Sequence, residues 1–337
     1  MSVETVVRPH VANFIAWSAD KPEVVVLAAD LTNSSEVGRW RDTYPERYFS
    51  MGMAEQNMLG VAGGLAREGL TPWVHTFAVF IYRRAYDQLA MSIAYPNLRV
   101  RLVGFLPGIT TPGGVTHQAI EDVAIMRATP NMTVLETGDA TEVESVLDVA
   151  QAVDGPVYIR MLRGVLPRLF PRDEPMALDQ VRILSEGTDV TLLSSGVETE
   201  EAMRAVQALS VRGVGIRHLH VSTHKPFADP AILESLSLAR MGVVTAENHS
   251  IVGGLGSAVA EVMAEAGVAS RLVRVGLRDT YAHGASRAYL AGEYGLDAIA
   301  IVRAVERLLG EPTGIGEGDL QKLELEPVGS VERSDSL

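Results

Sequence analysis

The chain has 337 residues, a length that suggests about two domains of ordinary size. Its formal net charge of -13 argues against a nucleic-acid-binding surface and leaves no polybasic patch for anionic lipid, and the lack of cysteine excludes disulfides, zinc–thiolate sites and iron–sulfur clusters. Residues 1–10 lack the apolar core of a signal peptide, and no apolar run approaches the ~20 residues of a membrane span. We therefore expect a cytoplasmic protein.

The first half of the chain alternates apolar strands with helices, which predicts an α/β domain with a mostly parallel sheet over residues 1–165. The run at 24–29 is apolar on both faces, as in a strand covered by helices on two sides. Apolar residues in 55–67 recur at helical spacing. In chain order, the pattern predicts helices over 3–19, 55–67, 83–94, 119–127 and 140–152, and strands over 24–29, 48–50, 71–76, 100–104, 133–136 and 157–161.

The amino-acid composition changes after residue 165, where a polar, proline-rich passage continues neither the strand nor the helix pattern. This passage predicts a linker over 166–180. A second α/β series follows over 181–310, so the second domain should also contain a mostly parallel sheet covered by helices. Residues 311–337 are dominated by glycine, proline and acids and predict a disordered tail.

One carboxylate, Glu55, is predicted in the first turn of the helix over 55–67, shortly after the strand at 48–50. In open α/β sheets, ligands bind beyond the carboxyl ends of the strands, which is where this residue falls. The helix dipole also favours an acid in the first turn, so position alone favours a structural role for Glu55. The residues that follow in the chain strengthen the functional interpretation.

Three aromatic or imidazole side chains are further candidates. His117 lies in the glycine-bearing segment GGVTHQ, where a histidine could donate to a carbonyl or hydroxyl, move a proton, or simply cap a loop. Phe77 and Phe80 form an aromatic wall if the chain turns between them. Such a pair usually belongs to the core and less often stacks on a heterocycle.

Two arginines, Arg160 and Arg163, follow a strand and could clamp a phosphate or carboxylate, or could be solvated. The segment GGLGS at 253–257 lacks the spacing of a dinucleotide loop and indicates close packing at a helix start. No two histidines share a helix face at metal-ligand spacing, and no Gly-x-Ser-x-Gly elbow of a serine hydrolase occurs.

Taken together, five motifs resemble the transketolase family, namely its pyrimidine-binding domain followed by its C-terminal domain. Their order and spacing carry the resemblance over about residues 3–309, nearly the whole chain. Among them, the motif RAYDQ at 84–88 and the pair Arg160 and Arg163 lean toward 1-deoxyxylulose-5-phosphate synthase in the same superfamily. The motifs are MGMAEQN at 51–57, TFAVF at 76–80, RAYDQ at 84–88, THQ at 116–118 and the segment 155–163.

The resemblance implies thiamine-diphosphate chemistry at a subunit interface. Glu55 matches the glutamate that hydrogen-bonds the aminopyrimidine ring of the cofactor, and the two phenylalanines match the aromatics that stack on it. His117 matches the histidine that contacts the donor's hydroxyl or carbonyl. The remaining implied contacts are Arg163 and, less closely, Arg160 with the acceptor phosphate, Asp30 with the cofactor, and Arg8 and Ser34 or Ser35 with substrate.

The family's diphosphate domain carries Gly-Asp-Gly and a later asparagine, which hold the metal and the cofactor phosphates. This sequence has no such pair, because Gly138-Asp139 is followed by alanine and Gly318-Asp319 by leucine, and the chain begins directly at the pyrimidine-binding domain. We therefore predict the C-terminal subunit of a split transketolase, which transfers a two-carbon ketol unit between sugar phosphates. A partner subunit would supply the diphosphate domain and hold Mg²⁺ or a similar ion, in a two-fold heterotetramer.

Two alternatives remain open. The β subunit of a 2-oxo acid dehydrogenase shares this two-domain layout, although the THQ and MGMAEQN motifs favour a transketolase. A non-catalytic binding or regulatory homologue would keep the fold without turnover. The joint presence of Glu55, His117 and both phenylalanines argues against that alternative, because a scaffold needs none of them.

Overall fold

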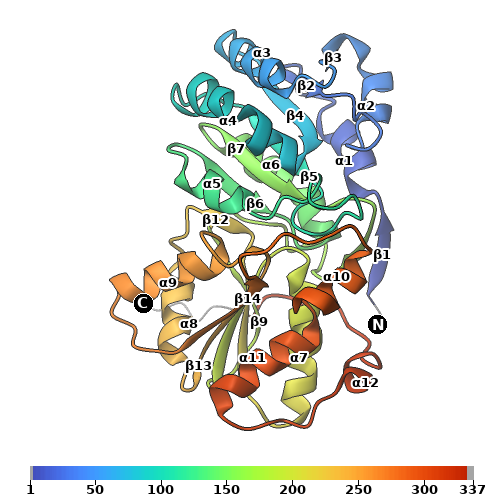
Figure 1. Ribbon diagram of the computed structural model, residues 1–337. Helices are drawn as coiled ribbons and strands as arrows, with labels where there is room; N and C mark the ends of the chain where they lie inside the picture. Colours follow the sequence, from blue (N-terminus) through green and yellow to red (C-terminus); the bar gives the residue numbers. More distant parts are fainter. Residues whose placement is uncertain (1–2, 332–337) are drawn as a thin grey trace.

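The computed structural model describes residues 3–331, which form two α/β domains stacked end to end (Figure 1). The first domain is built on a seven-stranded sheet of order β12-β6-β7-β5-β4-β2-β3, parallel except for the edge strand β12, which is donated by the second domain. This sheet consists of β2 (Val24–Ala28), β3 (Tyr48–Ser50), β4 (Thr71–Phe77), β5 (Arg101–Phe105), β6 (Thr133–Glu136), β7 (Val157–Met161) and β12 (Thr223–Lys225).

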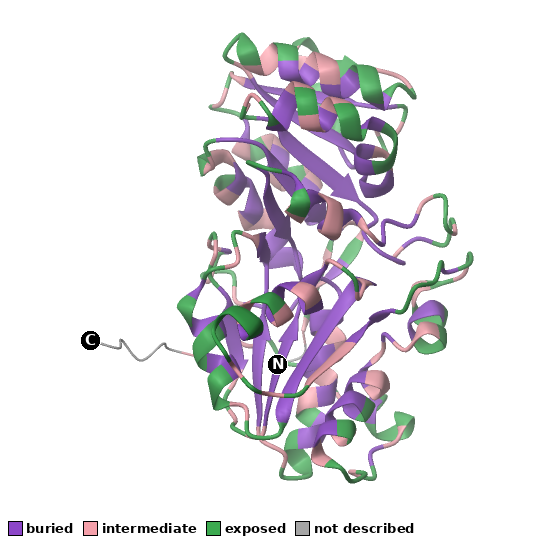
Figure 2. Cartoon of the chain, turned by 60° about the vertical axis from the view of Figure 1, so that its left-hand side comes forward, coloured by how far each residue is buried: buried purple, intermediate pink, exposed green. Residues whose placement is uncertain are grey.

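Helices cover both faces of this sheet in two groups that pack among themselves. On one side α1 (Pro9–Trp17), α2 (Gly38–Thr43) and α6 (Ala140–Ala152) are in contact. On the other side lie α3 (Glu55–Arg67), the π-helical turns η2 (Phe80–Arg84) and η3 (Leu89–Ala94), α4 (Ala85–Gln88) and α5 (Asp122–Ala128); the short 3₁₀ turn η1 (Pro45–Arg47) precedes β3. The central strands are buried throughout, as Figure 2 shows in purple.

Helix α3 has the bounds that its apolar spacing predicts, Glu55–Arg67. Met58, Leu59 and Ala62 are fully buried on its inner face. Burial of the two larger side chains stabilises the fold by about 2 kcal/mol each. Gly63 lets the backbone of η3 approach closely, because a Cβ at this position would lie 2.5 Å from the carbonyl oxygen of Ser92. The helix that begins with Glu55 is therefore fixed by packing rather than by a cap.

The second domain contains a five-stranded sheet of order β14-β13-β10-β11-β9, in which only β9 runs antiparallel to its neighbour. Its strands are β9 (Arg182–Ser185), β10 (Val190–Ser194), β11 (Ile216–His220), β13 (Gly242–Ser250) and β14 (Leu272–Leu277). Its helices are α7 (Glu198–Val211), α8 (Pro230–Leu238), α9 (Leu255–Glu265), α10 (Arg287–Tyr294), α11 (Ala298–Leu309) and α12 (Glu317–Leu320). None of the helices in residues 3–331 is long and apolar enough to cross a membrane.

The predictions for the start of the first helix and for the start of the linker are wrong. The helix predicted over 3–19 begins only at Pro9, because β1 (Glu4–Val7) pairs antiparallel with β8 (Val165–Arg168). Strand β8 also takes the first residues of the predicted linker 166–180. Local periodicity could not reveal this ribbon, since the partner strand lies at the other end of the first domain.

The predicted disordered tail is wrong for residues 311–331. Helix α12 packs on α7 and α11, and the chain then returns to the first residues after β8, where Val328 N donates to Leu169 O at 2.9 Å. Val331 N likewise donates to Ile183 O at 2.8 Å. Buried Leu320 and Leu325 hold this segment in place, so a few well-spaced leucines order a glycine-rich stretch. Residues 332–337 of the predicted tail lie outside the described residues.

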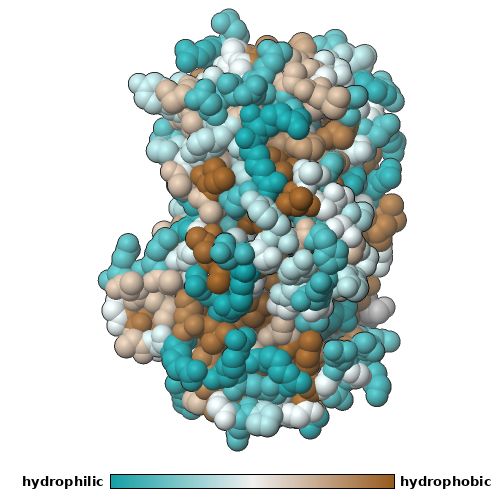
Figure 3. Space-filling model, viewed as in Figure 1, coloured by the Kyte–Doolittle hydropathy of each residue, from teal (hydrophilic) through white to brown (hydrophobic). Residues whose placement is uncertain are grey.

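Buried polar contacts join the two domains at the waist visible in Figure 3. Glu142 of α6 accepts from His220 of β11 at 2.9 Å and from Arg182 of β9 at 3.2 Å. Glu136 of β6 pairs with His224 of β12 at 2.7 Å. All five side chains are nearly excluded from solvent, so separating the domains would expose several charged groups that are now paired.

A buried acid, Glu247 of β13, packs against the start of α9 and explains the glycine at 254. Its carboxylate accepts from Leu255 N at 2.7 Å and Gly256 N at 2.9 Å at the start of α9. A Cβ at position 254 would collide with this carboxylate. The close packing predicted for the segment is therefore confirmed. Burial raises the pKa of Glu247 to about 7.

This raised pKa predicts a specific pH dependence of stability. The folded chain keeps a proton on Glu247 that the unfolded chain releases above its ordinary pKa of 4.5, so this group's contribution to the free energy of unfolding falls as pH rises from 4.5 to about 7. Glu247→Gln removes the titration. Measured by urea denaturation, the stability of the variant relative to the native chain should rise by about 3 kcal/mol across this window. A difference that does not change with pH would contradict the assignment.

Candidate active site

The carboxyl ends of the parallel strands meet at one edge of the first sheet, and the predicted site residues follow them there. Phe77 ends β4, the loop 107–119 follows β5, and Arg163 follows β7. Asp30 follows β2, and Glu55 opens α3 shortly after β3. The sheet topology therefore gathers side chains that are far apart in the sequence.

Glu55 is buried at the start of α3, with 2% of its side chain exposed. Its Oε2 accepts a hydrogen bond from Arg84 Nη1 at 2.7 Å, while Oε1 accepts none from the described residues. The Arg84 side chain belongs to η2 and is 47% exposed, so it reaches the buried carboxylate from the surface. This ion pair fixes Glu55 from one side and leaves one carboxylate oxygen for a ligand.

The aromatic wall predicted from the sequence is present. The chain leaves β4 at Phe77 and turns into η2, so that the rings of Phe77 and Phe80 stack at a centroid distance of 5.9 Å. The Arg84 guanidinium lies over Phe80 at 4.7 Å, and Arg163 lies over Phe77 at 5.7 Å. These contacts connect the buried Glu55 to the wall and to Arg163.

His117 completes this group. Its ring meets those of Phe77 and Phe80 edge-on, at centroid distances of 6.0 and 5.5 Å. Nδ1 of His117 shares a hydrogen bond of 2.8 Å with Oγ1 of Thr116, and Nε2 makes none with the described residues. An imidazole held at Nδ1 can present Nε2 to a substrate oxygen. We call Glu55, Phe77, Phe80, His117 and Arg163 the edge site.

Arg163 and the residues around it form the polar end of the edge site. Its Nη1 donates to the backbone oxygen of Ser34 at 2.9 Å. Burial lowers the pKa of Arg163, and burial raises the pKa of nearby Glu36, which accepts from Gly164 N at 2.9 Å. Arg8 approaches Glu36 at 4.0 Å with most of its side chain exposed. Two arginines thus flank a single acid at this end of the site.

Asp30, Ser34 and Ser35 have different surroundings in the structure. The register that pairs Ala28 with His75 puts exposed Asp30 at the same sheet edge as Phe77, and Asp30 has no hydrogen bond or ion pair with the described residues. Ser34 turns its backbone oxygen to Arg163. Ser35 is fully buried, and its hydroxyl makes no hydrogen bond with any residue of 3–331.

Arg160 does not belong to the edge site, and its predicted phosphate contact is wrong. The side chain lies inside β7, 1% exposed, rather than after the strand. Its Nε donates to Asp122 at 2.8 Å and its Nη1 to Glu136 at 2.5 Å. Although burial alone would raise it, this guanidinium together with His224 holds the pKa of Glu136 at about 2. Because this guanidinium is buried and donates to two carboxylates and to the backbone oxygens of Ala119 and Asn248, it is not accessible to a substrate phosphate.

The Gly138-Asp139 pair is also structural. Asp139 is fully buried and caps α6, where it accepts from Glu142 N at 2.8 Å and from Phe170 N at 2.9 Å. Within residues 3–331, no group of three or more histidines and acids could hold a metal ion. The carboxylate of Asp139 is therefore used for helix capping.

The prediction missed two arginines on η2. Arg84 was part of the RAYDQ motif, but nothing in its spacing indicated the ion pair with Glu55. Arg83 holds the segment around His117: it donates to Val115 O at 3.0 Å and to Gln118 O at 3.2 Å. It also forms a two-pronged ion pair with Glu121, at 2.7 and 2.8 Å. The signals in the sequence were the position of both arginines directly after the aromatic pair and, for Arg84, its place in the RAYDQ motif.

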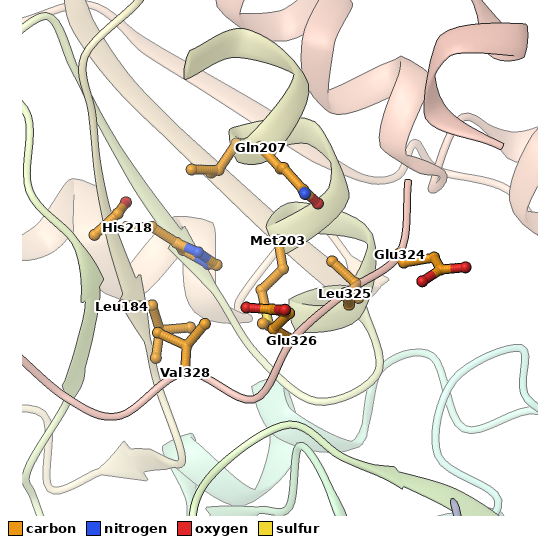
Figure 4. Close-up of a pocket in the computed structure, with 10 residues that line it drawn as sticks. Leu184, Met203, Gln207, His218, Glu324, Leu325, Glu326 and Val328 are labelled. Atoms are coloured by element: carbon orange, nitrogen blue, oxygen red, sulfur yellow. The ribbon is translucent and has the colours of Figure 1, made fainter. Parts of the chain in front are cut away.

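A separate cavity of about 320 Å³ lies in the second domain, between β9, β11, α7 and the segment 324–328 (Figure 4). Leu184, Met203, Leu325 and Val328 supply apolar walls, and His218 points into the space. Burial, helped by the neighbouring imidazole of β11, lowers the pKa of His218 to about 3, so its ring stays neutral. The returning tail closes one side of this cavity.

The fold and the edge site define a two-domain α/β protein with its candidate site at the carboxyl edge of the first sheet. A family model described as the transketolase pyrimidine-binding domain matches residues 12–168, and one described as the transketolase C-terminal domain matches residues 179–301. The chain therefore belongs to the transketolase family. Both the predicted family and the predicted α/β fold are confirmed.

Three relatives show how the chain compares in length. It is 41% identical over 300 residues to a 6-deoxy-6-sulfo-D-fructose transketolase subunit of Clostridium sp. (strain MSTE9), covering 89% of this chain and 92% of that protein. A solved split-gene transketolase, described as an inactive beta4 tetramer, matches with a TM-score of 0.82 and 38% identity over 90% of this chain and 97% of its own. The 1-deoxy-D-xylulose-5-phosphate synthase of Stutzerimonas stutzeri is 34% identical over 87% of this chain but only 45% of the synthase.

Proposed function

We propose that this chain is the C-terminal subunit of a split, thiamine-diphosphate-dependent transketolase that transfers a two-carbon ketol unit between sugar phosphates. The observation that carries the proposal is the edge site itself. A buried carboxylate, an aromatic pair and a histidine with a free ring nitrogen converge beside an arginine. The near full-length match to a transketolase subunit supports the same assignment.

The residues present fit the pyrimidine half of thiamine diphosphate. Glu55 offers one oxygen with no partner among the described residues, which can hold a proton at the aminopyrimidine ring. The stacked rings of Phe77 and Phe80 offer an apolar surface for that heterocycle. When bound, the cofactor supplies a carbon nucleophile for the ketose carbonyl. The chain's own contribution is to orient the ring, hold this proton and exclude water.

The substrate contacts follow from the same geometry. His117 Nε2 would contact a hydroxyl or carbonyl of the donor sugar, because Nδ1 is held by Thr116. Arg163, with Arg8 and the backbone of Ser34 close by, would bind the acceptor phosphate. Asp30, at the same sheet edge, is the further cofactor contact that we retain from the sequence.

A partner subunit completes this proposal. The Gly-Asp-Gly and asparagine pair that holds the metal and the cofactor phosphates in the family is missing from the sequence, so we assign Mg²⁺ or a similar ion to a partner with the diphosphate domain. Apolar side chains are exposed around α3, with Met53 just before the helix at 79%, and Met91 of η3 at 56% and Tyr86 of α4 at 40%, two elements that pack on α3. Such a surface suits a subunit contact. The proposed assembly is a two-fold heterotetramer.

A pull-down of this chain from its native extract tests the proposal. We expect a co-purifying protein of similar size that carries the Gly-Asp-Gly and asparagine motif, and a pair that binds thiamine diphosphate with Mg²⁺. Ketol transfer is then assayed with sugar phosphates. A chain that purifies alone and binds no cofactor, with or without candidate diphosphate-domain proteins, would overturn the proposal in favour of a non-catalytic homologue.

Arg163 gives a prediction about the acceptor. Arg163→Met removes a charge-assisted contact to phosphate, so the KM for a phosphorylated acceptor should rise about 10- to 100-fold with little change in kcat. Steady-state kinetics of the reconstituted enzyme measure this. The matched control is Arg99→Met, which removes an exposed arginine whose only hydrogen bond within residues 3–331 goes to Gln151 O. Equal KM values for the two variants would contradict the role of Arg163.

A second candidate, a 1-deoxyxylulose-5-phosphate-synthase-like reaction, is favoured by one observation. Arg84 of the RAYDQ motif, which leans toward that synthase, binds the candidate catalytic acid directly. The two candidates differ in the first step, because the synthase-like reaction begins with loss of CO₂ from a 2-oxo acid. Release of labelled CO₂ from pyruvate by the reconstituted enzyme would favour the synthase-like reaction, and ketol transfer without CO₂ release would favour the transketolase.

A further inference from the structure

The loop 107–119, which carries His117, is closed at its base. Gly108 N donates to Ala119 O at 2.7 Å, and Pro107 also forms a bridge with Ala119. The two ends of the loop are thereby tied together where the loop leaves and re-enters the fold. A residue that fixes this base therefore also fixes the position of His117 within the edge site.

A side chain of the second domain binds the base of this loop. Asn248 of β13 accepts from Ile109 N through Oδ1 at 3.0 Å and donates from Nδ2 to Pro107 O at 3.2 Å. It is 1% exposed. The side-chain amide therefore satisfies one backbone donor and one backbone acceptor of the loop at once, a pairing that defines the loop's position in two directions.

The fit between Asn248 and the loop is tight. Gly108 has a φ of +60°, and a Cβ on it would collide with both the side chain and the backbone oxygen of Asn248. That backbone oxygen accepts from Arg160 Nη2 at 3.1 Å, and the same nitrogen reaches Ala119 O at 3.3 Å. Arg160 thus anchors Asn248 and the far end of the loop together.

Two further points of the loop, Gln118 next to its base and Pro112 at its tip, also contact the second domain. Gln118 Nε2 donates to His283 O at 3.2 Å. A Cβ on Gly284 would lie 2.9 Å from Pro112 O, so only glycine permits this approach without displacement. Base and tip of the His117 loop are therefore both in contact with a domain that contributes no residue to the edge site.

We propose that Asn248 is a positioning residue, through which the C-terminal domain holds the His117 loop in its working place. The second domain thereby acts on the reaction indirectly, by setting where His117 stands relative to Phe77 and Phe80. This inference rests on the proposed function of His117. Asn248 touches neither cofactor nor substrate in this assignment.

Amide hydrogen exchange on the full chain tests whether Asn248 holds the His117 loop. Kinetics of the reconstituted enzyme test whether this affects turnover. In Asn248→Ala, the amides of Gly108, Ile109 and His117 should exchange about tenfold faster, while those of α3 remain unchanged. The value of kcat should fall about 10- to 100-fold, with the affinity for thiamine diphosphate within twofold of the native enzyme. Gly108→Ala, which pushes the loop off Asn248 from the other side, should act alike even if Asn248→Ala fails to fold.

The matched control is Arg182→Lys, which perturbs another buried contact between the domains, to Glu142, and donates no hydrogen bond to the loop. It should leave loop exchange and kcat unchanged. Native-like exchange of the loop in both Asn248→Ala and Gly108→Ala would overturn the proposal, and so would faster exchange with unchanged kcat. Failure of the proposed function would give a different pattern. In that case His117→Ala would leave turnover intact, while Asn248→Ala would still speed the amide exchange of the loop.

Discussion

Glu55→Ala should lower turnover of the reconstituted enzyme by about 100- to 10,000-fold, the usual range for loss of a positioned acid–base group. The reason is geometric. Glu55 offers the carboxylate oxygen that has no partner among the described residues, near the stacked rings of Phe77 and Phe80, while Arg84 holds the other oxygen at 2.7 Å. Alanine cannot hold a proton at the pyrimidine ring. Steady-state rates with saturating cofactor and sugar phosphates measure the loss.

The fold should survive this substitution, because Met58, Leu59 and Ala62 still anchor the helix. Circular dichroism and thermal unfolding check this. Glu68→Ala is the matched control, since Glu68 is an exposed acid at the other end of the same helix, at its C-cap. Rates for Glu55→Ala within threefold of the control would contradict the assignment of the catalytic acid.

Arg160→Met should destabilise the chain by about 3–5 kcal/mol, the cost of leaving buried carboxylates without their partner. Asp122 and Glu136 would both lose the guanidinium that compensates them. Equilibrium unfolding in urea measures this loss. The substitution should also loosen the contact between the domains, since Arg160 donates to Asn248 O at 3.1 Å.

Arg163→Met is the natural control for this experiment. Arg163 lies on the same segment but is half-buried and, in the part of the chain that the structure describes, donates a single hydrogen bond, to Ser34 O. Its loss should cost about 1 kcal/mol. If Arg160→Met lowers the free energy of unfolding by no more than Arg163→Met does, the buried hydrogen bonds of Arg160 do not hold β7 and the second domain together.

The sequence predicted those parts of the structure that depend on residues close together in the chain. Helix α3 has the predicted bounds, because its apolar spacing is set by a single buried face. The aromatic pair was expected to face one way if the chain turned, and the π-helical turn after β4 provides that turn. The gathering of Glu55, His117 and Arg163 followed from the general rule that parallel strands end at one edge.

The parts that failed depend on partners far away in the chain. Nothing near Arg160 indicates that Asp122 and Glu136 will bury it, so the residue looked like a second phosphate ligand. The contact of Asn248 with the His117 loop joins residues on different domains and left no periodic signal. Likewise, residues 311–331 are ordered by docking on α7 and on the chain after β8, which composition alone cannot indicate.

The most direct test of the central claim is a calorimetric titration of thiamine diphosphate, with Mg²⁺ present, into this chain, into the partner subunit and into their equimolar mixture. We predict no binding by this chain alone and saturable binding by the mixture, because this chain supplies the pyrimidine half of the site and the partner supplies the diphosphate half. Equal binding by this chain with and without the partner, or no binding by the mixture, would contradict this prediction.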